Sequence, residues 1–263
     1  MPVPTGSRAA AAAMFGTALP EAERYAELLA GPGVAQGLIG PAEAERVWER
    51  HILNCGAIAD FVPSRCSLID VGSGAGLPGI VLAILRPGVQ VTLLEPMARR
   101  VQFLRRCMSE LGLDRVEVVR ARAEDVAGEL SSDVVTARAV APLARLTELC
   151  AGVARPGGIV LAMKGASAAA ELAAARPVLA RLGVADARVL HVDAPADGGT
   201  ATVVAFTAPA RRPHIGKSRR PGASRPGARR QGSGPMAGGG SMPGGGAGAR
   251  RDTKQRGHRR SGG

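Results

Sequence analysis

Aromatic residues are scarce in this chain. One Trp, one Tyr and four Phe make up 2% of its 263 residues. Proteins that hold single-stranded nucleic acid by stacking its bases need aromatic platforms, so this class of binder is disfavoured. Hydrophobic residues still amount to 46%, which allows a sizeable core. That core must be built mainly from Ala, Val and Leu.

Cysteines are few, and long apolar runs are missing. No two of Cys55, Cys66, Cys107 and Cys150 form a Cys-x-x-Cys pair. Their spacing suits neither a zinc site nor a disulfide framework, so we expect no metal and four reduced core thiols. No apolar run reaches the ~18 residues of a membrane span, and the alanine run at 9–13 does not resemble a signal peptide. We therefore expect a cytoplasmic protein without a membrane partner.

Acidic residues almost disappear near the C-terminus. From Arg211 onward there are fourteen Lys or Arg but a single acid, Asp252, whereas residues 1–210 carry 20 bases and 21 acids. The net charge of +12 therefore belongs to the tail. Gly, Pro, Ser and Arg dominate residues 209–263, which we predict to be disordered. This tail could add salt-sensitive attraction to RNA, or it could be a passive extension.

Two helices are predicted ahead of the main sheet. Residues 1–16 are predicted to be disordered. A helix over 17–30 can be capped by Thr17 and stopped by the Gly-Pro-Gly run at 31–33, and Pro41 opens a second helix. We interpret residues 17–62 as a helical cap and residues 63–208 as the core, together forming one domain over 17–208.

The core alternates strands with helices. Strands are predicted at 66–71, 89–95, 116–120, 133–138, 158–163, 185–192 and 201–207, and helices at 77–85, 97–111, 142–154 and 168–182. This alternation favours a mainly parallel, doubly wound α/β sheet. The last two strands are joined by a turn at 194–199, which predicts an antiparallel hairpin at one edge. A seven-stranded sheet of this kind is typical of Rossmann-like methyltransferases that use S-adenosylmethionine (SAM).

A glycine-rich turn follows the first core strand. Gly72, Gly74 and Gly76 form Gly-x-Gly-x-Gly, whereas a dinucleotide site needs Gly-x-Gly-x-x-Gly. Leu77 occupies the position of the third dehydrogenase glycine, so a dehydrogenase is disfavoured. Glycines remove side chains where a cofactor must touch the backbone. The tighter spacing favours SAM, which has no pyrophosphate.

Carboxylates accompany this turn. Asp70 precedes it and could either order the loop or bind the methionine ammonium of SAM. Glu95 lies at the tip of the next strand, where a carboxylate can accept hydrogen bonds from both ribose hydroxyls. Ala123 and Glu124 follow the third strand and could contact adenine. Alternatively, they are simply a helix start with favourable acids.

Basic side chains end the fourth and fifth strands, at the edge where open sheets bind ligands. Arg138 could hold the methionine carboxylate, an RNA phosphate or guanine O6. Lys164 could contact a phosphate, and a simple ion pair is the alternative for both. His51, on the second cap helix, either packs or makes a hydrogen bond from helix to sheet; alternatively, it belongs to the substrate site. The arginines of 97–111 are more typical of a solvated helix face than of a binding stripe.

The run from Asp70 to Gly79 resembles the signature of the RsmG (GidB) family of ribosomal RNA methyltransferases. Three further segments are similar to family motifs: Arg50-His-Ile-Leu53, Ala137-Arg-Ala139 and Met163-Lys-Gly165. The match covers roughly residues 35–208. The resemblance implies methyl transfer from SAM to N7 of a guanine in 16S ribosomal RNA, with that RNA or the small ribosomal subunit as partner. It also implies SAM contacts at Gly72, Leu77, Ala123, Glu124 and Arg138.

Methyl transfer to guanine N7 requires little acid–base catalysis from the protein. Guanine N7 carries a lone pair and no proton, so direct attack on the methyl group needs no general base. Alignment and exclusion of water are the main tasks, with Arg138 and Lys164 as candidate positioning residues. Methylation of another substrate on the same fold is an alternative, as is a non-catalytic nucleic-acid-binding protein with a vestigial pocket. We expect a monomer.

Overall fold

Seven strands form one sheet in the order β3-β2-β1-β4-β5-β7-β6. The computed structural model describes residues 2–195 and 199–210, which fall within one compact unit. The first five strands are parallel, and β7 runs antiparallel to β5 and β6. The predicted parallel sheet and edge hairpin are confirmed. The strands are β1 Ser67–Val71, β2 Gln90–Leu94, β3 Val116–Val119, β4 Ser132–Arg138, β5 Ala154–Lys164, β6 Arg188–Asp193 and β7 Thr200–Thr207.

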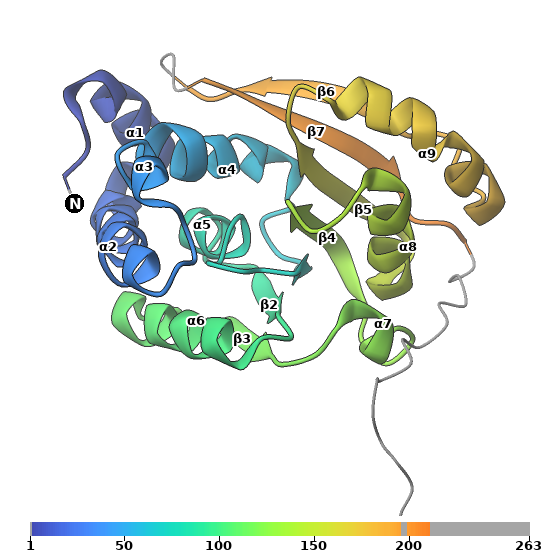
Figure 1. Cartoon of the computed structure of the whole chain (residues 1–263), viewed down its shortest axis with the longest axis horizontal. Coiled ribbons are helices and arrows are strands. Elements are labelled where there is room, and N and C mark those ends of the chain that lie inside the picture. The colour runs from blue at the N-terminus through green and yellow to red at the C-terminus, as the bar shows by residue number, and fades with distance from the viewer. Residues whose placement is uncertain (1, 196–198, 211–263) are drawn as a thin grey trace, which may run out of the picture. The chain divides into compact units, whose positions relative to one another are not determined.

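Helices cover both faces of this sheet. Figure 1 shows the N-terminal helices with α5 and α6 on one side, and α8 and α9 on the other. Gly112 and Gly183 end α6 and α9 in left-handed conformations, a common way to terminate a helix. The helices of the core are α5 Gly79–Leu85, α6 Ala98–Leu111, α7 Ala123–Val126, α8 Leu143–Val153 and α9 Ala168–Leu182.

Alternation along the strands separates two hydrophobic cores. Leu68 of β1 packs on the side of α5, α6 and the N-terminal helices, whereas its neighbour Ile69 packs on the side of α8 and α9. Successive strand side chains point to opposite faces, which explains this division. The larger side chains Tyr25, Trp48 and Phe103 all lie in the first core and are at most 1% exposed.

The N-terminal segment is helical, so the prediction of disorder over residues 1–16 is wrong. η1 spans Thr5–Ser7 and α1 spans Arg8–Phe15. Ala10 and Ala11 are completely buried, and Phe15 meets Trp48 edge-on with ring centroids 6.3 Å apart. Alanine is the best helix former, and its small side chain lets α1 approach the cap closely. Most of the buried face of α1 is alanine, so the sequence pattern did not show it as amphipathic.

The cap continues through short and irregular helices. The predicted stop at residues 31–33 is wrong, because a π-helical turn carries the chain through Pro32 and helical structure resumes at 34–35. The wider turn accommodates a proline ring that would clash within an α-helix. The elements are η2 Gly16–Ala18, α2 Leu19–Leu28, η3 Leu29–Gly33, α3 Pro41–Ala44, η4 Val47–Leu53, α4 Asn54–Gly56 and η5 Ala57–Phe61.

The remaining predictions on composition have mixed outcomes. All four cysteines are free thiols, and Cys55, Cys107 and Cys150 are buried as predicted. Cys66 is only half-buried and packs at the margin of the first core. None of the helices among the described residues combines the length and apolar character needed to cross a membrane. From residue 211 onward the predicted disordered tail lies outside the described residues.

Candidate functional site

The loop between β1 and α5 depends on its three glycines. Gly72, Gly74 and Gly76 have φ of +66°, +58° and +99°, which favour glycine. A Cβ atom at Gly72 would lie 2.8 Å from Val140 Cγ2, and one at Gly76 would lie 2.4 Å from Ile80 Cδ1. At Gly74, only the Gly72 carbonyl oxygen comes within 4 Å, at 3.8 Å. Gly74 is therefore the point at which the loop backbone faces open space.

Asp70 orders the junction between this loop and α5. Its carboxyl group is completely buried; Oδ1 accepts a hydrogen bond from the Thr136 hydroxyl at 3.0 Å, and Oδ2 accepts one from the Gly79 amide at 3.2 Å. Burial raises the pKa of Asp70 to about 7, against the lowering effect of these donors. Of the two roles predicted for Asp70, the structure favours loop ordering. Thr136 was missed, although its hydroxyl is the one within the strand predicted at 133–138.

Glu95 ties the tip of β2 to the glycine loop. Its Oε2 accepts a hydrogen bond from the Gly74 amide at 3.0 Å, and its Oε1 accepts one from the Met97 amide at 2.9 Å. Arg100 Nη1 lies 3.6 Å from Oε2. The side chain is 1% exposed, and each oxygen keeps a second lone pair for another donor. The predicted position of Glu95 beside the loop is confirmed.

Tyr25 connects the cap to the same loop, a contact that the sequence analysis missed. Its hydroxyl donates to the Ala75 carbonyl oxygen at 2.8 Å, and the side chain is fully buried. Burial raises the pKa of Tyr25 well above its ordinary value, so the phenol remains a donor. It is the only tyrosine in the chain, which is the one sequence signal that could have drawn attention to it.

Three further residues assigned to SAM lie close to the sheet edge. Leu77 is 9% exposed and belongs to the hydrophobic core; it precedes α5, which begins two residues later than predicted. Ala123 and Glu124 open α7 and are 5% and 8% exposed. Glu124 Oε1 accepts a hydrogen bond from Arg145 Nη2 at 3.4 Å. Contacts of these residues with SAM stay predictions.

Arg138 joins the end of β4 to the cap. Its Nη2 donates to the Arg50 carbonyl oxygen at 2.9 Å and to His51 Nδ1 at 2.7 Å, while Nη1 donates to Cys55 Sγ at 3.0 Å. These partners are a carbonyl, an imidazole and a thiol, so the alternative of a simple ion pair is wrong. The contact explains why residues more than 80 positions apart in the sequence belong to one site.

His51 is a neutral hydrogen-bond acceptor at Nδ1. An arginine can only donate, so the ring proton must reside on Nε2. His51 is 5% exposed; desolvation and the charge of Arg138 lower its pKa to about 4. Among the described residues Nε2 has no hydrogen-bond partner, and it lies 3.9 Å from Glu43 Oε1.

Lys164 is engaged within the protein. Its Nζ donates to Glu171 Oε2 at 2.7 Å and to the Ala141 carbonyl oxygen at 2.8 Å, and its side chain is 8% exposed. The ion-pair alternative for this residue therefore holds in the structure. These bonds connect β5 to α9 and to the segment that follows β4.

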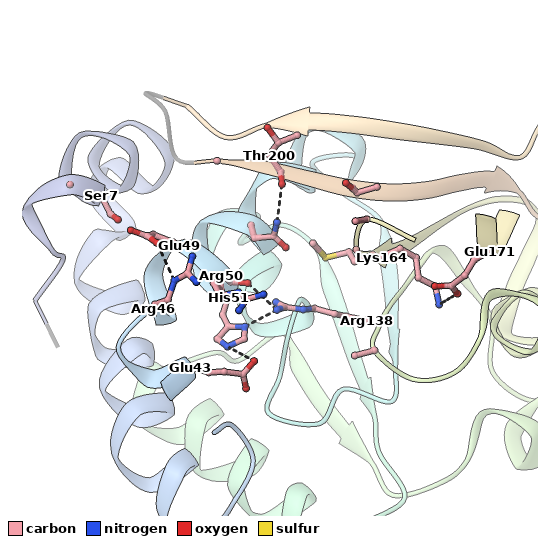
Figure 2. Close-up of a pocket in the computed structure, with 18 residues that line it drawn as sticks. Ser7, Glu43, Arg46, Glu49, Arg50, His51, Arg138, Lys164, Glu171 and Thr200 are labelled. Atoms are coloured by element: carbon pink, nitrogen blue, oxygen red, sulfur yellow. Dashed lines mark hydrogen bonds and ion pairs between the residues drawn. The ribbon is translucent and has the colours of Figure 1, made fainter. Parts of the chain in front are cut away.

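A cavity of about 850 Å³ lies at the carboxyl ends of β4 and β5. Figure 2 shows His51, Arg138 and Lys164 around it, with Arg50 on the cap side and Thr200 at the start of β7. The three residues predicted to bind substrate thus share one cavity. The glycine loop and Glu95 do not line it, so the candidate site has two neighbouring parts.

Strand register explains why these parts are neighbours. Val71 pairs with both Leu94 and Ala137. Gly72 and Glu95, which follow β1 and β2, therefore lie at the same carboxyl end of the sheet as Arg138, the last residue of β4. The strand order, the antiparallel β7 and the loop with its facing carboxylate define a Rossmann-like α/β domain of the SAM-dependent methyltransferase type. This is the class to which the fold and the site assign the chain.

Comparison with known proteins identifies the family. The model of GidB, described as rRNA small subunit methyltransferase G, matches residues 18–197. A ribosomal RNA small subunit methyltransferase G from Thermobifida fusca is 49% identical over 227 residues, covering 82% of this chain and 94% of the relative. Its counterpart from a Nocardioides strain is 54% identical over 184 residues, covering 70% and 73%. The chain belongs to the GidB family.

Solved structures show a weaker likeness. A SAM-dependent O-methyltransferase from Thermotoga maritima aligns with a TM-score of 0.48 and 17% identity, covering 61% of this chain and 66% of that one. The fold assignment therefore depends on the observed strand order.

Proposed function

We propose that this protein transfers a methyl group from SAM to N7 of a guanine in 16S ribosomal RNA, in the cytoplasm, on the RNA or on the small ribosomal subunit. The observation that carries the proposal is the bond between the Gly74 amide and Glu95, at the centre of the family-matched segment. It holds the Glu95 carboxylate, for which we propose ribose binding, next to the open face of the loop and near a cavity whose lining includes Arg50, Arg138 and Lys164.

The residues at the loop fit SAM. Gly74 leaves space for a ligand against the backbone, and Glu95 has lone pairs available for ribose hydroxyls. Gly72, Gly76 and Leu77 would shape the same side. Ala123 and Glu124 would lie toward the adenine, while Asp70 acts through the loop. When bound, SAM supplies an electrophilic methyl group on a sulfonium.

The chain's own task is to align the base and exclude water. Guanine N7 has no proton to lose, so none of these residues needs to act as a general base. His51 is neutral at physiological pH. Arg138 donates hydrogen bonds to the cap, and Lys164 is paired with Glu171. We propose that Arg138 and Lys164 position the substrate by fixing the cavity walls. A rigid wall lowers the entropy cost of alignment.

Two measurements test this function. Isothermal titration should show binding of SAM and none of NAD. Mass mapping of 16S ribosomal RNA from cells with and without the gene should show one 7-methylguanosine that depends on the gene. Binding of NAD in place of SAM would contradict the pocket assignment. Binding of SAM together with unchanged RNA methylation would favour a different substrate on the same fold.

A further inference from the structure

The side chains of the Arg50-His-Ile-Leu53 segment lie in three environments. Ile52 and Leu53 are completely buried in the core, and His51 accepts a hydrogen bond from Arg138. Arg50 is exposed and lines the cavity, as Figure 2 shows. Packing accounts for the apolar pair and the link to β4 accounts for His51, but neither accounts for the Arg50 guanidinium.

Arg50 differs from the other cations of the cavity. Lys164 is paired with Glu171, and the Arg138 donors are directed to the cap. Arg46 lies 3.6 Å from Glu49. Within residues 2–195 and 199–210, the Arg50 side chain makes no hydrogen bond or ion pair. Among the cations described at this wall, the Arg50 side chain is therefore the one that makes neither a hydrogen bond nor an ion pair.

The backbone of Arg50 is held in place. Its amide donates to the Arg46 carbonyl oxygen at 2.9 Å, and its carbonyl oxygen accepts from Arg138 Nη2, also at 2.9 Å. The Arg50 backbone is thus hydrogen-bonded to both the cap and β4, while the guanidinium is available to bind a ligand. A fixed backbone with an unpaired guanidinium suits the binding of an anionic ligand that approaches the opening of the cavity.

We propose that Arg50 contacts a phosphate of the RNA strand whose base enters the cavity. The proposal rests on the proposed function. A phosphate neighbouring the target nucleotide carries a negative charge that can pair with the Arg50 guanidinium. A guanidinium can bind a phosphate through two parallel hydrogen bonds. Phosphate contacts of this kind set the register of a nucleic acid, whereas base contacts provide specificity. Arg50 thereby takes the role that the sequence pattern offered to Lys164.

The salt dependence of RNA binding tests the proposal. Binding of the full-length protein to small ribosomal subunits from cells lacking the gene is measured at several KCl concentrations and constant Mg²⁺. Arg50→Gln should weaken binding and reduce the slope of log K against log[KCl] by about 0.7 to 0.9, the effect of one phosphate contact. Arg50→Lys should restore most of the slope. Arg65→Gln is the matched control. It removes the same charge just before the amino end of β1, opposite the carboxyl ends that form the site, and should leave the slope unchanged.

An unchanged slope in Arg50→Gln would overturn the proposal, as would an equal loss of affinity at every salt concentration, which would indicate a base contact. SAM titration and thermal unfolding of each variant establish that the fold and the cofactor site are intact. If the unaltered protein binds neither SAM nor subunits, the proposed function itself fails. If it binds both and only the predicted slope change is missing, the assignment of Arg50 alone fails.

Discussion

The three glycines of the loop are not equivalent at the level of single residues. Gly72 and Gly76 are required by the protein itself, since a Cβ atom at either would collide with Val140 or Ile80. Gly74 has space beside it, so its constraint comes from backbone conformation and from whatever binds there. Substitutions at these positions should therefore separate folding from ligand binding.

Gly74→Asp should leave the protein folded and abolish or strongly weaken SAM binding. Aspartate tolerates the left-handed conformation better than most residues, and its carboxylate would fill the open space beside Glu95. We expect an affinity loss of at least tenfold, about 1.4 kcal/mol, by isothermal titration.

Gly76→Ala is the matched comparison. It should lower the free energy of unfolding by about 1–3 kcal/mol, because the new methyl group would overpack against Ile80 and the Tyr25 hydroxyl.

Unchanged SAM affinity in a folded Gly74→Asp protein would contradict the assignment of the glycine loop as the SAM pocket.

Two buried titratable residues should give opposing pH dependences of stability. His51 has a folded pKa of about 4, below its usual 6.5, so the unfolded chain binds the extra proton and stability falls as pH drops from 6.5 to 4. Asp70 has a folded pKa of about 7, above its usual 3.8, so stability falls as pH rises from 3.8 to 7. Each effect is on the order of 3–4 kcal/mol.

Variants should separate the two contributions. In His51→Asn the free energy of unfolding, measured in urea at several pH values from 4.5 to 6.5, should decrease more steeply with rising pH than in the unaltered protein. In Asp70→Asn it should increase more steeply. Asparagine at position 51 keeps an acceptor near the place of Nδ1, so the Arg138 contact is retained. Parallel pH profiles for all three proteins would contradict the assignment of either group.

At the scale of elements, long-range side-chain hydrogen bonds attach the cap to the site. α2 reaches the glycine loop through Tyr25, and the η4–α4 segment reaches β4 through Arg138. Apolar runs and turn residues predicted each strand and the antiparallel edge, because those signals are local. The contacts of Tyr25 and Arg138 join residues 50 or more positions apart, and no local pattern encodes such docking. The π turn at Pro32 escaped prediction for a related reason, since packing overrides a local stop signal.

Tyr25→Phe should loosen the glycine loop without unfolding the protein. The substitution removes one buried hydrogen bond and leaves the Ala75 carbonyl oxygen without its donor, at a cost of about 1–3 kcal/mol. We expect weaker SAM binding and faster amide hydrogen exchange in residues 73–78, with little change in β4 and β5. Protection of the loop equal to that of the unaltered protein would show that α2 does not hold it. Phe103→Leu, in the same core but away from the loop, is a suitable control.

At the scale of the whole molecule, the candidate site and the excess of basic residues lie in different parts of the sequence. Residues 1–210 carry nearly balanced charge and contain the loop, Glu95 and the cavity, whereas the basic excess follows Arg211. The edge of the sheet that holds the site could be predicted from the strand order. The engagement of Lys164 by Glu171 could not, because it depends on how α9 packs beside β5.

Deletion of residues 211–263 should leave SAM affinity unchanged and weaken association with small ribosomal subunits mainly at low salt. The deleted segment contributes long-range attraction that is screened as salt increases. Titration with SAM and subunit binding at low and high KCl measure the two effects. A truncated protein that is folded but has lost SAM affinity would contradict this division of roles.

The single tryptophan gives the protein an optical reporter of its own. Trp48 is 1% exposed, stands edge-on to Phe15 and lies in η4, the element that also carries Arg50 and His51. Because tryptophan emission shifts with the polarity and rigidity of its surroundings, the native fluorescence of this chain would register displacement of the cap in real time. Rapid mixing with either reaction partner could then be followed without attaching a dye.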